Sequence, residues 1–96
     1  MSVYATAWAW DQPVRQNEKL LLLFLADNAD RSGAGNALTD ILDHAQVVCG
    51  FERLTLKKHL DDLEQAGLFQ ATDGGGYRLN LGNGKPKLGA FRLDVD

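Results

Sequence analysis

The hydrophobic and polar positions along the chain first predict a helix in its N-terminal third. The run 20–26 holds seven apolar residues without a charge, so a helix there would be apolar on nearly all sides. Before it, Asn17 is a suitable N-terminal cap and Glu18 lies favourably in the first turn. The helix should end near Asn28, because turn-forming residues crowd between positions 30 and 36. We expect this helix at the centre of the core, with a loop after it.

Two further helices are predicted in the middle of the chain. After Thr39, a good cap, apolar residues recur at three- and four-residue steps as far as Val48, which indicates a second, shorter helix ending near Gly50. A third helix is predicted over 52–66, with Gly67 as its C-terminal cap. It is amphipathic, because charged residues project away from an apolar stripe formed by Leu56, Leu60 and Leu63.

The residues after the third helix predict a two-stranded hairpin. Segments 68–72 and 77–81 flank Asp73 and three glycines, which tolerate the positive φ angles of a tight turn. The chain is therefore predicted to be mainly α with a small β hairpin, an α+β protein. One core is expected from the apolar stripes, namely Leu21, Phe24, Leu25, Ile41, Leu56, Leu60, Leu63 and Leu68.

The two ends of the chain are predicted to lie outside the domain formed by residues 16–81. Residues 1–15 are expected to form an N-terminal arm, in which the alternation of ATAWAW places Trp8 and Trp10 on one face of an extended segment. We expect the pair to pack on the core, with stacking on nucleic-acid bases as the alternative. Residues 82–96 mix Gly, Asn, Lys and Pro with a short apolar patch, which fits either a tail or an extra strand.

Length and composition limit the class of function. A chain of 96 residues forms one domain with a modest core, and no Ser/His/Asp or Cys/His set has the context of a catalytic site, so we expect no enzymatic activity. The longest apolar run is far shorter than the roughly 20 residues that span a bilayer, and the N-terminus does not resemble a signal peptide. We therefore expect a cytoplasmic protein with no membrane partner.

The side chains that could bind a metal have no recognisable pattern in the sequence. Cys49 is the only cysteine, and the spacing of His44, Cys49 and His59 matches no zinc motif, so neither a metal nor a cofactor is predicted. His59 is expected to be a half-buried structural histidine, with a phosphate contact or a pH effect on affinity as the alternative. Asp61 and Asp62 are interpreted as part of a solvated helix face.

The charge distribution is uneven, although the formal net charge is −3. Between positions 74 and 93 the chain has four basic residues and no acidic one, whereas between 27 and 43 it has four aspartates and one arginine. A dipole of this kind can orient a protein towards DNA even when the total charge is negative, and the alternative is an ordinary soluble surface. Seven of the ten basic residues lie on the third predicted helix or after the hairpin turn: Arg53, Lys57, Lys58, Arg78, Lys85, Lys87 and Arg92.

The stretch GFERLTLKKHLDDLEQAGLF, residues 50–69, resembles the winged helix-turn-helix proteins. The resemblance covers about residues 16–81, and the opening ATAWAW with the Leu-rich first helix is similar to N-terminal domains of phage and plasmid replication proteins and to small helix-turn-helix regulators. The residues that carry it are a turn glycine, the apolar residue after it, a Thr-aliphatic pair and a Leu-x-x-Leu-x-x-x-Gly-Leu ending, here Gly50, Phe51, Thr55-Leu56 and Leu60 to Leu68.

This resemblance implies three helices and a two-stranded wing, with helix 52–66 in the DNA major groove and the wing formed by 68–81. The family commonly has a serine where this chain has Glu52, and Leu54 replaces a usual polar contact. The basic stretch after the wing adds Lys85 and Lys87 to the predicted DNA-binding residues. Matched position by position, the residues implied to face DNA are Arg53, Leu54, Thr55, Lys57 and Lys58 on the helix, and Arg78 on the wing.

Two functions follow as hypotheses. The first is a small non-enzymatic protein of phage or mobile-element type that binds double-stranded DNA, as a transcription regulator or a replication accessory, with homodimerisation left open. The second is a winged-helix protein-interaction module, such as a small phage inhibitor of a host complex. The net charge of −1 between Glu52 and Glu64 and an exposed Leu54 would favour this second function.

Overall fold

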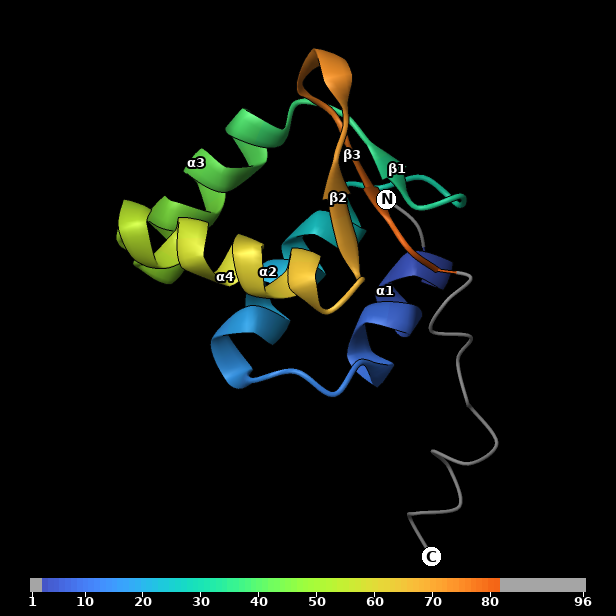
Figure 1. The fold of residues 1–96 in the computed structure, drawn as a ribbon, viewed down its shortest axis with the longest axis horizontal. Coiled ribbons are helices and arrows are strands. Elements are labelled where there is room, and N and C mark those ends of the chain that lie inside the picture. Colours follow the sequence, from blue (N-terminus) through green and yellow to red (C-terminus); the bar gives the residue numbers. More distant parts are fainter. Residues whose placement is uncertain (1–2, 82–96) are drawn as a thin grey trace, which may run out of the picture.

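The computed structural model describes residues 3–81, which form four helices and a small antiparallel sheet (Figure 1). This arrangement agrees with the predicted mainly α, α+β class. The helices are α1 (Val3–Asp11), α2 (Gln16–Asp27), α3 (Leu38–Cys49) and α4 (Arg53–Gln65). The strands are β1 (Ala34–Gly35), β2 (Phe69–Ala71) and β3 (Tyr77–Leu79), with a short 3₁₀ turn, Asp73–Gly75, between the last two.

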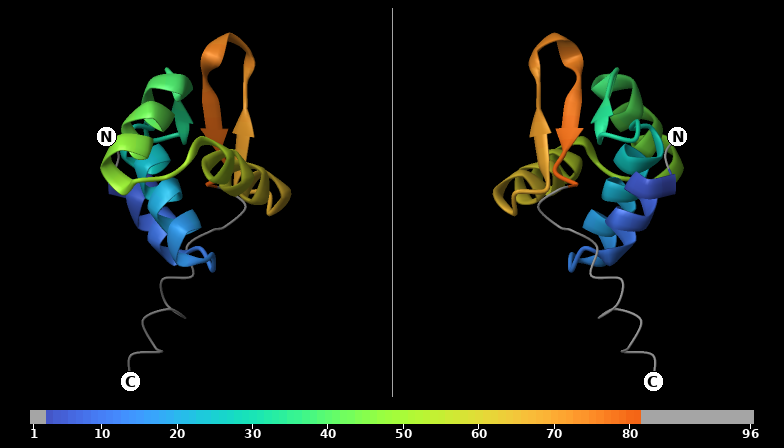
Figure 2. Two further views of the ribbon diagram at one scale, coloured as in Figure 1. Left: turned by 90° about the vertical axis from the view of Figure 1, so that its left-hand side faces the viewer. Right: turned by 90° about the vertical axis from the view of Figure 1, so that its right-hand side faces the viewer.

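The predicted hairpin is confirmed, and it belongs to a larger sheet than the sequence indicated. β2 and β3 pair antiparallel with Phe69 opposite Leu79, and their connection projects beyond the helices (Figures 1 and 2). β1 pairs with the other edge of β3, so the strand order is β1-β3-β2. β1 lies in the predicted loop between the first two predicted helices, and its two residues are too few to show an alternating pattern.

Residues 3–11 form helix α1, so the prediction of an extended segment at ATAWAW is wrong. Trp8 is fully buried, whereas Trp10 is 60% exposed. Side chains two positions apart share a face in a strand but diverge around a helix, so the two indoles do not lie on one face. The alternation of alanine with larger residues is compatible with either structure, and contacts with α2 accompany the helix.

Lys19 of α2 closes the C-terminal end of α1. Its ammonium Nζ donates to the backbone carbonyls of Ala9 at 3.0 Å, Trp10 at 2.6 Å and Gln12 at 2.6 Å. The last carbonyls of a helix have no partner within the helix, and a cation there also complements the helix dipole. Burial lowers the pKa of Lys19, while the nearby charge of Asp11 acts in the opposite direction.

For the first two predicted helices, which are α2 and α3, the predicted N-terminal caps are wrong, whereas the predicted C-terminal ends are confirmed. α2 begins at Gln16, and α3 begins at Leu38, so Asn17 and Thr39 lie inside the helices rather than before them. Within residues 3–81 neither capping residue, Arg15 or Ala37, makes a side-chain hydrogen bond, but at the start of α2 Glu18 Oε1 accepts the backbone N–H of Arg15 at 3.4 Å. α2 ends before Asn28, and α3 ends before Gly50, as expected.

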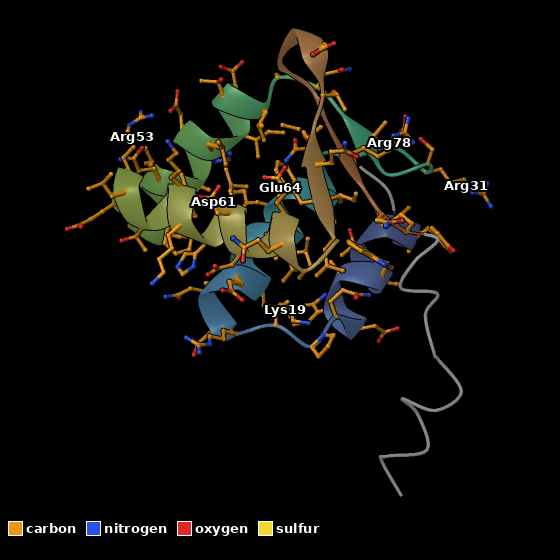
Figure 3. The ribbon with its side chains drawn as sticks, in the orientation of Figure 1. Lys19, Arg31, Arg53, Asp61, Glu64 and Arg78 are labelled. Carbon is orange, nitrogen blue, oxygen red and sulfur yellow. The ribbon has the colours of Figure 1, made fainter. Side chains whose placement is uncertain are left out.

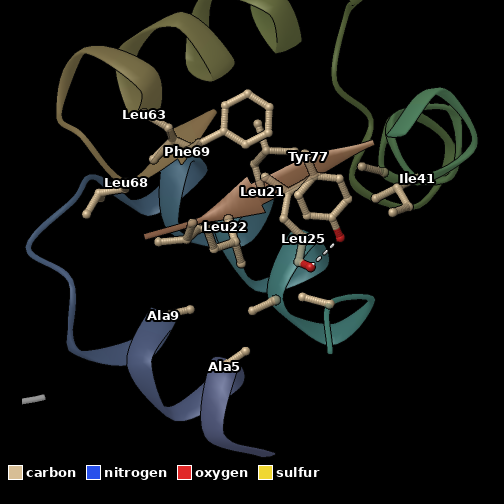
Figure 4. Close-up of a cluster of buried hydrophobic side chains, with 14 of the residues drawn as sticks. Ala5, Ala9, Leu21, Leu22, Leu25, Ile41, Leu63, Leu68, Phe69 and Tyr77 are labelled. Atoms are coloured by element: carbon tan, nitrogen blue, oxygen red, sulfur yellow. Dashed lines mark hydrogen bonds between the residues drawn. The ribbon is translucent and has the colours of Figure 1, made fainter. Parts of the chain in front are cut away.

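The core lies between α2, α4 and the sheet, with α1 against the other side of α2 (Figure 4). Of the eight core residues that the sequence predicted, six are buried, while Phe24 and Leu60 are only partly buried at its edge. The ring of Phe24 meets the exposed His44 edge-on at 5.5 Å, which places it at the boundary between α2 and α3. Trp8 packs in the core as expected, and the core also contains residues that were not predicted for it, including Leu22, Tyr77 and Leu79.

Tyr77 ties the sheet to α2. Its hydroxyl donates to the backbone carbonyl of Leu25 at 2.6 Å inside the core, as Figure 4 shows, and so satisfies one of the last four carbonyls of α2. Its ring lies against β1, where a Cβ added to Gly35 would come within 2.2 Å of the Tyr77 Cζ atom. Glycine is therefore required at position 35 because of space.

We expect alkaline pH to destabilise the fold through Tyr77. Burial, assisted by the charges of Asp27 and Asp30, raises the pKa of Tyr77 to about 12, whereas an unfolded tyrosine has a pKa of about 10. The stabilisation from the protonated hydroxyl is thus complete below about pH 10 and is lost as the pH rises towards 12. Denaturant unfolding should show a loss of about 2 kcal/mol by pH 11.5 relative to Tyr77→Phe. An equal alkaline loss in Tyr77→Phe would assign the effect to other groups.

Candidate nucleic-acid interface

Helices α3 and α4 are joined by the three residues 50–52. Gly50 adopts a left-handed conformation, with φ of 75°, and its N–H donates to the Gln46 carbonyl at 3.0 Å. In the described part of the chain no atom lies within 4 Å of the position that a Cβ would take there, so glycine is favoured by the backbone conformation rather than by lack of space. Phe51 is buried in the core and anchors the connection. The turn predicted at Gly50 is therefore confirmed.

The two faces of α4 differ sharply in burial. Leu56 and Leu63 are buried, and Leu60 is packed against the core. Among the residues predicted to face DNA on this helix, Thr55 is half-buried, and the other four are exposed in the first two turns: Arg53, Leu54, Lys57 and Lys58. The helix is held by its leucines and presents a separate solvent face.

Charges on α4 are segregated along its length. The basic residues lie in its first two turns, whereas Asp61, Asp62 and Glu64 lie in its second half, and Figure 3 shows Arg53 at one end of the helix with Asp61 and Glu64 farther along. Arg53 Nη2 lies 3.5 Å from Asp43 Oδ1, and both side chains are largely exposed. An exposed pair of this kind contributes only about 0–1 kcal/mol, so Arg53 can exchange it for an anionic ligand.

Arg78 lies away from the basic half of α4. It occupies the middle of β3, opposite Ala34 on one side and Gln70 on the other, and is exposed. Figure 3 shows it on the opposite side of the molecule from Arg53, where it lines an open hollow together with Glu64. The structure therefore brings together the predicted residues of α4 and leaves Arg78 on a separate surface.

The turn between α3 and α4 is flanked by exposed apolar side chains, of which the sequence analysis singled out Leu54 alone. Val47 and Leu54 are 82% and 81% exposed, and Val48 is also exposed although it belongs to the apolar pattern of the second predicted helix. Of that pattern, Ile41 and Ala45 are buried in the core and Leu42 packs against it. The sequence carries no signal for this exposure, because Val48 lies three positions after Ala45 and continues the apolar pattern.

Two of the predicted DNA-binding residues, Lys85 and Lys87, lie outside the described residues, as does the whole segment 82–96.

Comparison of the chain with protein-family models, with curated proteins and with solved structures gave no match in any of the three. No helix within residues 3–81 combines the length and apolar character needed to cross a membrane. The function proposed below therefore depends on the geometry and charges of this chain.

Proposed function

We propose that the protein is a non-enzymatic double-stranded DNA-binding protein that reads DNA with the first two turns of α4. The observation that carries this proposal is the set of exposed basic side chains in the first two turns of α4. They lie on the face away from the buried leucines, and this part of the helix directly follows the short turn from α3. The major groove of B-DNA admits one α-helix, and the second helix of a helix-turn-helix contacts base edges with its N-terminal residues. The basic residues of α4 are concentrated in that part.

The side chains of α4 offer complementary contacts. Arg53, Lys57 and Lys58 can donate to phosphates or to guanine O6 and N7. Leu54 and the methyl group of Thr55 suit apolar contact with a thymine methyl group. Acidic residues in the second half of the helix would then face away from the phosphates, because only the N-terminal part of the helix enters the groove.

The order of elements supports a winged helix-turn-helix as the class of this domain. α2, β1, α3 and α4 precede the β2–β3 hairpin, which projects beyond the helices as a wing would (Figure 2). Transcription regulation or replication of a phage or mobile element is the setting that the sequence resemblance implies. A phosphate contact from Arg78 is a separate part of the proposal, because that residue lies on another surface than Arg53.

A protein partner is the second candidate function. It is favoured by the exposed Val47, Val48 and Leu54, which flank the same turn that the DNA proposal uses. Apolar side chains exposed in a group mark interaction sites in soluble domains. The two functions differ in their dependence on salt, since contacts with phosphates weaken steeply as salt rises and apolar contacts do not.

The test is a fluorescence anisotropy titration of the protein against random-sequence duplex DNA over a range of salt concentrations. Lys57→Ala and Lys58→Ala should each weaken binding and reduce the slope of log K against log salt by about one unit if each lysine contacts a phosphate. The matched control is Arg31→Ala, because Arg31 is exposed on the far side from Arg53 (Figure 3). That variant should bind like the wild type.

Variants of two arginines test whether α4 reads the base sequence and whether the hairpin contacts phosphates. Arg53→Ala should change the sequence preference by about 1–3 kcal/mol if the guanidinium reaches a base edge, whereas Arg78→Glu should lower the affinity for all duplexes alike. Absence of duplex binding by the wild type at low salt would exclude the DNA proposal and leave the protein partner. Unchanged binding in Arg78→Glu alone would remove only the wing contact.

A further inference from the structure

A histidine and two carboxylates meet where α2 packs against α4. Glu18 comes from the first turn of α2, and His59 and Asp62 lie one turn apart on α4. One potential ligand atom from each lies within 4.8 Å of the others, and all three residues are half-buried. Glu18 is partly fixed, because its Oε1 accepts the backbone N–H of Arg15 at 3.4 Å while its Oε2 faces His59.

The imidazole of His59 lacks a hydrogen-bond partner. Within residues 3–81 both of its ring nitrogens are buried and make no hydrogen bond, and its ring meets Phe51 edge-on at 5.7 Å. Buried polar atoms normally have a partner, and an imidazole is also the commonest metal ligand. The distance of 3.9 Å from His59 Nδ1 to Glu18 Oε2 is too long for a hydrogen bond. It leaves space for an atom bound to both groups.

The negative charge of this cluster also favours the binding of a cation. No Lys or Arg side chain in the described part of the chain forms an ion pair with Glu18 or Asp62. Two half-buried carboxylates without a Lys or Arg partner repel each other, and burial weakens the screening by water. A bound cation would neutralise both carboxylates and would supply the missing partner of the imidazole.

We propose that Glu18, His59 and Asp62 form a binding site for a divalent transition-metal ion, with Zn²⁺ as the representative. Imidazole nitrogen and carboxylate oxygen both bind Zn²⁺ at about 2.0–2.2 Å, whereas Mg²⁺ and Ca²⁺ take oxygen ligands and would not use the histidine. Three protein ligands leave a fourth position for water or another ligand. The bound ion would link α2 to α4 and so hold the proposed DNA-reading helix in place.

The sequence predicted no metal because the third ligand is distant along the chain. His59 and Asp62 share a helix face, but Glu18 lies 41 positions before His59 and reaches it only because α2 packs against α4. The interpretation of Asp61 and Asp62 as one solvated face also needs correction, since Asp61 is exposed and Asp62 is half-buried.

The test is calorimetric titration of the tag-free, metal-free protein with Zn²⁺, together with Co²⁺ as a spectroscopic probe. We expect saturation near one equivalent, a higher Tm with Zn²⁺, and visible Co²⁺ absorption bands that Zn²⁺ displaces and excess Mg²⁺ does not. His59→Ala should abolish all three signals. The matched control is His44→Ala, since His44 is the other histidine and is exposed on α3, and this variant should bind like the wild type.

The carboxylates are tested by variants of nearly unchanged shape. Glu18→Gln and Asp62→Asn should each weaken Zn²⁺ binding about tenfold or more, and they keep the proposal testable if His59→Ala does not fold. No saturable Zn²⁺ binding by the wild type would overturn the site, as would an equal loss of binding in His44→Ala. Because Zn²⁺ binding is measured without DNA, failure of the site and failure of the DNA proposal are distinguishable.

Discussion

Replacing Trp8 by alanine should lower the free energy of unfolding by about 3–5 kcal/mol, because it removes the largest side chain that is completely buried. The indole packs in the core with residues of α2, and nothing else in α1 can fill the space it leaves. Chemical denaturation followed by circular dichroism measures this loss. A change of that size would show that α1 is an integral part of the fold.

Trp10→Ala is the matched control for this prediction. The Trp10 side chain is mainly exposed, and its ring contacts the Lys19 ammonium, which lies 6.0 Å from the ring centroid. Its removal should cost no more than about 1 kcal/mol. Trp8→Phe should lie between the two, since it keeps most of the apolar volume and removes a buried indole N–H that has no hydrogen-bond partner among residues 3–81. Equal effects of Trp8→Ala and Trp10→Ala would contradict the assigned burial.

Leu63→Ala should cost about 2–5 kcal/mol, because Leu63 is completely buried where α4 meets the core. The sequence placed Leu60 in the core together with Leu63, but Leu60 is only partly buried. Leu60→Ala should therefore cost clearly less, and the pair forms an internal comparison on one helix face. Urea unfolding of both variants would measure the difference. A larger loss for Leu60→Ala than for Leu63→Ala would mean that α4 is rotated relative to the structure.

DNA binding by Leu63→Ala provides a further check on the proposed function. The side chain faces the core and not the solvent, so the folded fraction of this variant should bind duplex DNA with unchanged affinity and salt dependence. Lys57→Ala should show the reverse, with altered binding and stability within about 0.5 kcal/mol of the wild type, since Lys57 is exposed. This opposite pattern would separate the residues that hold α4 from those proposed to contact DNA.

Local patterns predicted α3, α4 and the hairpin well. The amphipathic stripe of α4 and Gly67 at its end are confirmed, since Gly67 follows the helix with φ of 79° and its N–H donates to the Glu64 carbonyl at 3.0 Å. The triple glycine likewise connects two paired strands. Each of these features depends on residues a few positions apart, whose backbone preferences and periodicity are visible in the sequence.

Contacts between distant segments account for what the sequence did not indicate. The ATAWAW segment forms a helix packed on α2, and two residues of a predicted loop pair with β3. Neither segment has a pattern of its own that distinguishes these structures from the predicted ones.

The sequence by itself determined the α+β class, the turn at Gly50 and the exposed basic residues at the start of α4, because all of these follow from local spacing. The tertiary structure alone decided which tryptophan is buried, that Arg78 lies apart from Arg53, and that Glu18 meets His59. These outcomes depend on how α1, α2 and the sheet pack around one core. Such packing brings together residues that lie tens of positions apart, and the periodicity of the sequence does not predict contacts over that distance.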